Sequence, residues 1–265
     1  TERAGRKVFL GKHSKPIRRA FYLFGMKKEN LIILAIVILA VALRFIYFKE
    51  SIYFGYDEAR DAYTSQAIYL QKDFKLLGPV ANYPGIHHGP LFWYILGPMY
   101  LISGGEVMSV SVIFRIINAL GVIPIYLIGK KFFNKEVGFI SALIFAISFE
   151  QTQYAMYVGN PSLAIFSFLL LFYGTALIDK DKKEKGLILM FASVSLGIQL
   201  EFILIYMVPL LVILLFLLRD RLKIIKLRTW VIAFVSAFLI LSTFFLAELK
   251  FNFQMTKSVI NLLKT

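Results

Sequence analysis

The sequence contains no cysteine and has few charged residues. Charged side chains make up 17% of its 265 residues. Without cysteine, the chain can hold neither a disulfide framework nor a thiolate metal or redox site. Hydrophobic residues make up 58%, with a mean hydropathy of +0.71, which is too much apolar surface for one water-bounded core. The composition therefore excludes a soluble domain and predicts an integral membrane protein.

Several catalytic signatures are also missing. The sequence has no P-loop, no Rossmann glycine pattern, no H-E-x-x-H and no G-x-S-x-G. This argues against a nucleotide-driven pump and a membrane metalloprotease. Acidic residues are few as well, with 16 against 30 basic ones and a net charge of +14. In a membrane protein, such an excess indicates cytoplasmic loops and anionic lipid headgroups rather than nucleic acid.

Long apolar runs predict an all-α integral membrane protein with about seven transmembrane helices. A bilayer core needs about 20 apolar residues per helix, and slightly shorter runs are tolerated. A further run, Pro90–Ser103, has Gly97-Pro98 in its middle and is too short to span, so we expect a juxtamembrane helix there. We expect spans at Leu31–Phe48, Ser109–Gly129, Val137–Gln151, Pro161–Ile178, Gly186–Leu200, Phe202–Leu218 and Thr229–Ala247.

The positions of the basic residues support this count. If Pro90–Ser103 does not cross the membrane, all the basic clusters fall on one side, as the positive-inside rule expects. We therefore predict a multi-pass protein of the cell (plasma) membrane with a cytoplasmic N-terminus and an external C-terminus. The clusters lie in residues 1–28, 130–135, 180–185 and 219–228.

Two parts follow from this topology. Residues 1–30 form a basic cytoplasmic tail, and residues 31–265 form the transmembrane domain, with a first external loop at 49–108. The chain begins with Thr1 rather than methionine, so we expect it to be a fragment.

A charged patch, "YFGYDEARDAY", lies in the first external loop. One interpretation makes Asp57 the N-cap of a helix and Glu58 a complement to the helix dipole. The same geometry suits a general base, because a capped carboxylate that faces a cleft is held in position. Arg60 and Asp61 are interpreted as the solvated side of this helix. The expected membrane-facing stripe consists of Ala59, Ala62/Tyr63, Gln66/Ala67 and Leu70.

Two histidines precede the juxtamembrane helix in "NYPGIHHGPLFWYI". Either His87 or His88 could pair with Asp57 or Glu58 to hold a divalent cation, or could hydrogen-bond a phosphate. An interfacial histidine beside an aromatic belt is the alternative for each.

Three further polar sites follow along the chain. Arg115 lies about two turns inside the second span, where a buried arginine needs a partner such as a carboxylate or a lipid-linked phosphate. Snorkelling to the surface is the alternative. Asn160 and Pro161 fit first an N-cap followed by proline at the first helical position. Glu201 and Glu248 lie where apolar runs end and carry no specific signal alone.

The ordered set of these motifs resembles a known family. An acidic pair (Asp57 and Glu58), then "HHGPLFWYI", then "SVIFRIINALGVIPIYLIGKKFF" and then "YVGNPS" is similar to polyprenyl-phosphate-sugar glycosyltransferases. These belong to the GT-C superfamily, here in its branch of protein mannosyltransferases (family 39) and aminoarabinose transferases. Members often have two prolines where this chain has Gly89 and Pro90, and some have Asp at the position of Asn160.

The resemblance implies a GT-C-like helical bundle with juxtamembrane helices, and an enzyme that transfers a sugar from a polyprenyl-phosphate donor. Because family members typically have further spans, it also implies that this chain is the N-terminal part of such an enzyme. The acceptor is a protein, glycan or lipid on the external face. Asp57 is then the general base and Glu58 assists it. Arg115, His88 and Asn160 are the candidates for binding the donor phosphate. Glu58 and His87 would hold a divalent cation if the enzyme uses one.

A second hypothesis needs no catalysis. The same external residues could line a cavity in a lipid-binding or transport-type membrane protein. The arrangement of the external carboxylates and Arg115 discriminates between the two hypotheses, because only an enzyme needs them to converge on one closed cleft.

Overall fold

The computed structural model describes residues 27–179 and 182–264, and their regular secondary structure is helical apart from one isolated bridge between Val80 and His87. Most of the expected basic tail lies outside the described residues. The helices are α2 (Lys28–Arg44), α3 (Tyr56–Leu70), α4 (Leu91–Ile102), α5 (Val107–Leu120), α6 (Val122–Phe132), α7 (Lys135–Ile147), α8 (Phe149–Met156), α9 (Asn160–Asp179), α10 (Lys183–Leu200), the 3-10 turn η1 (Phe202–Tyr206), α11 (Met207–Leu217), α12 (Arg219–Leu222), α13 (Leu227–Lys250) and α14 (Gln254–Leu262).

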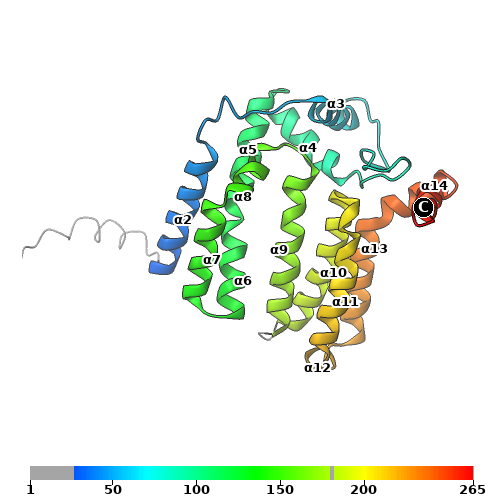
Figure 1. The fold of residues 1–265 in the computed structure, drawn as a ribbon. Helices are drawn as coiled ribbons and strands as arrows, with labels where there is room; N and C mark the ends of the chain where they lie inside the picture. The colour runs from blue at the N-terminus through cyan, green and yellow to red at the C-terminus, as the bar shows by residue number, and fades with distance from the viewer. Residues whose placement is uncertain (1–26, 180–181, 265) are drawn as a thin grey trace, which may run out of the picture.

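The long helices form a bundle that is closed at one end by shorter ones. Figure 1 shows α2, α7, α6, α9, α10, α11 and α13 running side by side, with α3 and the loop before α4 across one end. We call this the α3 end. Helix α14 lies beside it, at the edge of the bundle (Figure 1). The polar residues of the candidate site discussed below, except Arg115, lie at the α3 end.

Three helices among the described residues are long and apolar enough to cross a membrane. They are α5 and α6 taken as one continuous helix (Val107–Phe132), α9 (Asn160–Asp179) and α13 (Leu227–Lys250). The all-helical membrane architecture predicted from the sequence is therefore confirmed in its coarse form. The expected juxtamembrane run is the short apolar helix Leu91–Ile102, and Phe202–Leu217 is a second short one.

One expected span is interrupted in the structure. The run Val137–Gln151 does not form one helix, because α7 ends at Ile147 and α8 begins at Phe149. Ser148 causes the break: its hydroxyl accepts a hydrogen bond from Gln151 N–H at 3.3 Å and so caps α8. Helix α8 thereby becomes a separate element at the α3 end.

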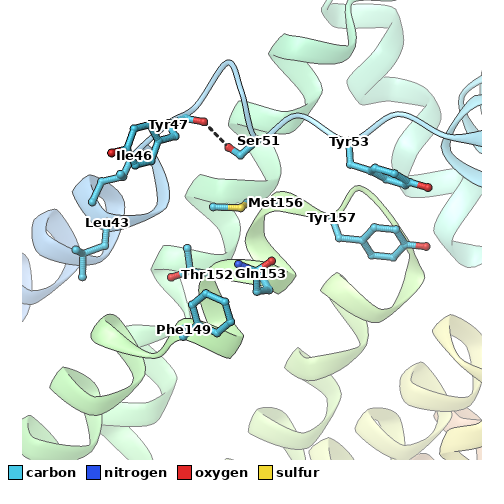
Figure 2. Close-up of a pocket in the computed structure, with 10 residues that line it drawn as sticks. All are labelled: Leu43, Ile46, Tyr47, Ser51, Tyr53, Phe149, Thr152, Gln153, Met156 and Tyr157. Atoms are coloured by element: carbon cyan, nitrogen blue, oxygen red, sulfur yellow. Dashed lines mark hydrogen bonds between the residues drawn. The ribbon is translucent and has the colours of Figure 1, made fainter.

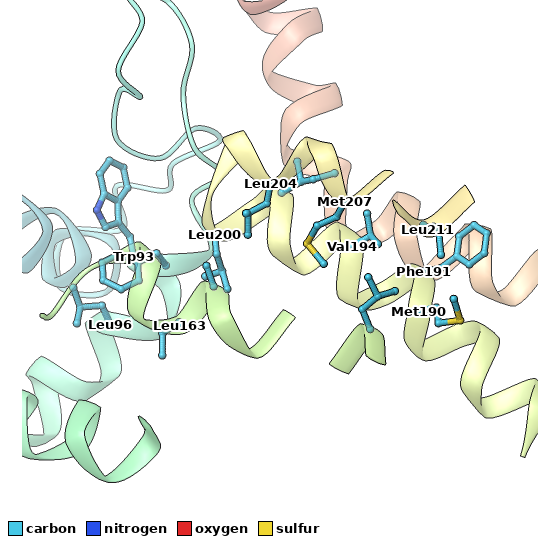
Figure 3. Packing of buried hydrophobic residues seen from close by; sticks show 14 of the residues in the cluster. Trp93, Leu96, Leu163, Met190, Phe191, Val194, Leu200, Leu204, Met207 and Leu211 are labelled. Atoms are coloured by element: carbon cyan, nitrogen blue, oxygen red, sulfur yellow. The ribbon is translucent and has the colours of Figure 1, made fainter. Parts of the chain in front are cut away.

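The apolar core lies where α4, α9 and α10 meet. Figure 3 shows Trp93 and Leu96 of α4 near Leu163 of α9 and Leu200 of α10. The backbones of α9 and α10 approach closely, since a Cβ on Gly186 would lie 2.6 Å from the Gly174 carbonyl oxygen. Close backbone contact at small residues is a common way of packing helices in membranes.

Two fully buried arginines join α2 to α5 and α7. Arg44 donates from Nε to Asn118 Oδ1 at 2.6 Å and from Nη1 to the Ala146 carbonyl at 3.0 Å. Arg115 donates from Nη2 to Ser51 Oγ at 2.9 Å and from Nη1 to the Arg44 carbonyl. Carbonyls at helix ends lack partners within the helix, so the guanidinium groups satisfy them where water is excluded.

We expect Arg44→Met to destabilise the fold. The substitution keeps an apolar stem but leaves the Ala146 carbonyl and the Asn118 amide oxygen without a donor, at a cost on the order of 3 kcal/mol. Thermal unfolding in detergent measures the loss. Arg228→Met, at an exposed position of α13, is the matched control. Equal melting temperatures for the two variants would contradict the role assigned to Arg44.

Candidate active site

A cavity of about 780 Å³ opens at the α3 end, and we call it the α3 cavity. Its walls come from α3, the loop before α4, the start of α9, the Glu201–Tyr206 segment and α14. The cavity brings together three predicted site residues, Asp57, His88 and Asn160, and two that the sequence did not single out, Asp61 and Glu201. Asp57 and Glu201, which lie far apart in the chain, thus line the same cavity.

The two acidic residues at the start of α3 do not have the structural roles that the sequence predicted. The helix begins at Tyr56, and the Glu58 carboxylate accepts a hydrogen bond from Gly55 N–H at 2.8 Å. The capping interaction expected for Asp57 therefore belongs to Glu58, which is 3% exposed. Asp57 remains largely exposed on the cavity wall, where its Oδ1 accepts from Arg60 Nη1 at 2.6 Å.

The interpretation of Asp61 as a solvated residue is wrong. Its carboxylate is buried, and Oδ1 accepts from Trp93 Nε1 at 2.8 Å and from Arg60 Nε at 2.9 Å. Burial raises the pKa of Asp61, while the bonds from Trp93 and Arg60 oppose that rise. Arg60 is also only partly exposed, because it lies between Asp57 and Asp61.

Part of the stripe on α3 that was expected to face the membrane is exposed in the structure, and its contact with lipid stays a prediction. Leu70 is 68% and Tyr63 is 69% exposed. The buried face consists of Glu58, Asp61, Ala62, Ser65, Ala67 and Ile68. The small residues at 62 and 65 indicate which face of α3 is buried, because they let α4 approach closely. A Cβ on Gly97 of α4 would lie 2.5 Å from the Ser65 carbonyl oxygen.

His88 and Asn160 form hydrogen bonds with the backbone where α10 ends and η1 begins. The Phe202 N–H donates to His88 Nδ1 at 3.0 Å, and a Glu201 carboxylate oxygen lies 3.3 Å from the same nitrogen. Asn160 Nδ2 donates to the Leu200 carbonyl at 2.8 Å. Two backbone groups left free where the helix stops are thus satisfied by side chains. The contact of His88 with Glu201 joins residues that lie far apart in the sequence.

The surroundings favour the neutral form of both partners. Burial lowers the pKa of His88 to about 4, with the charges of Arg60 and His87 adding to the effect. Burial raises the pKa of Glu201 to about 7. An imidazole nitrogen that accepts from Phe202 N–H is unprotonated, which agrees with a neutral His88. Glu201 therefore changes its charge near neutral pH.

Gly89 allows this contact between the loop and α10. A Cβ at position 89 would lie 1.9 Å from Gln199 Oε1 and 2.6 Å from the Gln199 carbonyl oxygen. The preceding His88 is fixed by backbone pairing, with Gly78 N–H donating to its carbonyl at 2.8 Å. Because position 89 has no side chain, the loop comes close enough to α10 for His88 to reach Phe202.

Glu248 orients α14 over the cavity. Its carboxylate accepts from the N–H groups of Met255 and Thr256 at 3.1 and 3.2 Å, and so caps the helix. Val259 and Leu262 of α14 form part of the cavity wall. The hairpin tip before α4 touches the same helix, since a Cβ on Gly85 would lie 2.3 Å from Ser258 Oγ.

The residues predicted to hold a cation are not gathered around a third ligand. Glu58 is engaged by Gly55, and His87 Nδ1 lies 3.1 Å from the Gly78 carbonyl oxygen. Within residues 27–179 and 182–264, no group of three or more His, Asp or Glu side chains has metal-ligand geometry. The cation role of Glu58 and His87 stays a prediction, and no chemical step below depends on it.

Arg115 does not border the α3 cavity. Its guanidinium donates to Ser51 and to the Arg44 carbonyl, and it lies 4.8 Å from the centre of the Phe48 ring. Its predicted contact with a donor phosphate stays a prediction. Of the described residues that line the cavity, the only arginine or lysine is Arg60.

Comparison with known families identifies the family of the chain. A family model described as dolichyl-phosphate-mannose-protein mannosyltransferase matches residues 87–246. The chain belongs to this family. The match confirms the resemblance to GT-C glycosyltransferases and supports a glycosyltransferase-type enzyme of the membrane. No curated protein and no solved structure matched the chain. His88, Asn160 and Glu201 lie inside the matched residues, and Asp57 precedes them.

We expect Glu201→Gln to flatten the pH dependence of stability. The pKa of Glu201 is raised in the folded protein, so its contribution is present at low pH and is lost as pH rises from about 4.5 through about 7. The wild type should lose on the order of 2 kcal/mol between pH 5 and pH 8 that the variant does not lose. Melting temperatures in detergent across this range measure the difference.

The control for this prediction is Glu150→Gln, at an exposed position of α8. It should follow the wild-type pH profile. If Glu201→Gln also follows that profile, then Glu201 does not ionise in this range.

Proposed function

We propose that this protein transfers a sugar from a polyprenyl-phosphate donor to an acceptor hydroxyl at the external membrane face, with Asp57 as the general base. The observation that carries the proposal is the α3 cavity, which combines an exposed carboxylate, a cation and neutral polar groups with an apolar wall. Membership of the mannosyltransferase family supports the reaction class.

The apolar wall of the cavity suits the hydrocarbon part of such a donor. It is formed by Ala164, Ile165 and Phe168 of α9 together with Ile205 and Leu262. A prenyl chain buried there would gain about 0.8 kcal/mol per buried CH₂ group. Because this wall lies next to Arg60 and His88, one ligand could bind both with a greasy chain and with an anionic head.

Arg60 is the proposed partner of the donor phosphate. Guanidinium groups bind phosphate through paired hydrogen bonds, and Arg60 already directs its donors toward the cavity carboxylates. The phosphate would replace Asp57 as the partner of Nη1, which would free the Asp57 carboxylate to accept a proton. His88 and Asn160 are the proposed neutral contacts of the same headgroup.

The reaction requires the acceptor oxygen and the donor phosphate on opposite sides of the anomeric carbon. The acceptor oxygen bonds to the anomeric carbon while the bond from that carbon to the phosphate oxygen breaks. The hydroxyl proton passes to Asp57, and the polyprenyl phosphate leaves with the electron pair, stabilised by Arg60. Attack opposite the leaving group inverts the anomeric centre.

Seven spans with a cytoplasmic N-terminus complete the proposal. This topology puts the α3 end on the external face together with the C-terminal helix α14. The basic residues of α12 then lie at the opposite end of the bundle (Figure 1), as the positive-inside rule requires for a cytoplasmic turn.

We expect Asp57→Asn to lose sugar transfer while the protein stays folded. An amide cannot take the acceptor proton, and removal of a general base lowers turnover by about 10²- to 10⁴-fold. Transfer from dolichyl-phosphate mannose to a threonine-containing peptide measures the loss, and the melting temperature reports the fold. Because Asp57 is largely exposed, stability should change little.

Asp73→Asn provides the matched control. Asp73 is also exposed and pairs with a cation, Lys75, but it lies in the loop after α3 and does not line the cavity. It should keep wild-type turnover. Full turnover in Asp57→Asn would exclude Asp57 as the base. Tight donor binding by a wild type that transfers nothing would favour the non-catalytic lipid-binding hypothesis.

A further inference from the structure

The guanidinium of Arg60 lies between two carboxylates that differ in burial. Asp57 and Asp61 are four residues apart and therefore lie on the same side of α3, one turn from each other. The side chain of Asp57 is 60% exposed, whereas that of Asp61 is 5% exposed. Arg60 Nη1 donates to Asp57 Oδ1 at 2.6 Å, and Nε donates to Asp61 Oδ1 at 2.9 Å. The cation thus has one partner at the surface and one in the interior.

The two partners differ in how easily a ligand can replace them. An ion pair exposed to water contributes little to stability, so Asp57 can be displaced at small cost. Loss of a buried partner leaves a charge without compensation, so we expect the bond to Asp61 to persist. Arg60 Nη2 also lies 2.9 Å from Asp61 Oδ1, so Asp61 occupies the edge of the guanidinium that carries Nε and Nη2. The end that carries Nη1 is left for Asp57 or for a ligand.

Trp93 of α4 fixes the position of the Asp61 carboxylate. Its Nε1 donates to the same Asp61 oxygen at 2.8 Å, and its side chain is buried. Close packing of α3 and α4 permits this bond, because one turn further along each helix a Cβ on Gly97 would lie 2.5 Å from the Ser65 carbonyl oxygen. Trp93 is not one of the residues that line the α3 cavity. Any effect that it has on a ligand there must therefore pass through Asp61.

A further cavity of about 670 Å³ lies between the end of α2 and α8, and none of the residues that line it is charged. Figure 2 shows it between Tyr47, after α2, and Phe149 of α8. An anionic headgroup would find no cation in its wall. In the α3 cavity, the only arginine or lysine among the described lining residues is Arg60. Binding of an anionic headgroup there therefore depends on where the Arg60 guanidinium points.

We propose that Asp61 and Trp93 are positioning residues that hold the Arg60 guanidinium toward the α3 cavity, ready for the donor phosphate. This inference rests on the proposed function. A free arginine side chain has many rotamers, and ordering it when a ligand binds costs affinity. Because Asp61 and Trp93 order Arg60 beforehand, the phosphate has to displace only Asp57. They also prevent the guanidinium from turning fully onto Asp57, which keeps the proposed base available.

The two tryptophans of the chain give a matched pair of variants. Trp93→Phe removes the hydrogen bond to Asp61 and keeps an aromatic ring, while Trp230→Phe makes the same change on α13, where the ring packs against Phe191 and Phe234. With dolichyl-phosphate mannose and a threonine-containing peptide, Trp93→Phe should raise the KM for the donor about fivefold and the KM for the peptide less than about twofold. Trp230→Phe should resemble the wild type. Equal donor KM values in the two variants would overturn the proposal.

Asp61→Ala distinguishes positioning from a simple effect of charge. If Asp61 only added negative charge to the cavity, its removal would strengthen the binding of an anionic ligand. The proposal predicts the opposite, because Arg60 would lose its buried partner. The Kd of dolichyl phosphate, which needs no sugar transfer, should become about fivefold weaker in this variant. Tighter binding would overturn the proposal. Melting temperatures report the fold, and if Asp61→Ala does not fold, Trp93→Phe, which changes no charge, serves in the same binding assay.

A double substitution separates positioning of Arg60 from a general effect on the fold. When Arg60→Ala is already present, Trp93→Phe should change the Kd of dolichyl phosphate less than about twofold, because Trp93 acts through Arg60. A loss of affinity equal to that in the wild-type background would overturn the proposal. A protein that transfers no sugar but binds dolichyl phosphate with this dependence on Trp93 would refute the proposed function and support the positioning of Arg60.

Discussion

The site depends on one interruption in hydrogen bonding, where α10 stops at Leu200 and η1 starts at Phe202. The groups freed there are taken up by Asn160, which donates to the Leu200 carbonyl, and by His88, which accepts from Phe202 N–H. Buried backbone groups must have partners, so the break fixes both side chains. These two hydrogen bonds attach α9 and the loop before α4 to the same point, so separate elements are joined at the cavity.

That constraint also explains which predictions from sequence succeeded. Apolar length and charge placement predicted the helical membrane class and the short helix Leu91–Ile102. Asn160 was noticed as an N-cap before proline, and His88 as a possible ligand of a cation or phosphate. Their actual partners, Leu200 and Phe202, could not be predicted, because contacts across 40 and 114 positions depend on tertiary packing.

The failures on α3 and α7 have local physical causes. On α3, Asp61 was assigned to the solvated side, but close packing against α4 selected the face with small residues and buried Asp61 beside Trp93. On α7 the apolar run continued past Ser148, whose hydroxyl competes for backbone donors and starts a new helix. The extra break matters, because α8 forms one wall of the cavity between α8 and the end of α2.

The charges of the α3 cavity impose a condition on any anionic ligand. Three carboxylates, Asp57, Asp61 and Glu201, line the cavity, against the guanidinium of Arg60. A phosphate would be repelled if all three were ionised and unpaired, because like charges interact strongly where water is partly excluded. Arg60 offsets Asp57 and Asp61 through direct bonds, and burial favours the neutral form of Glu201. The burial of Glu201 beside a neutral His88 thus keeps the cavity open to an anionic headgroup while Asp57, the most exposed of the three, remains available as a base.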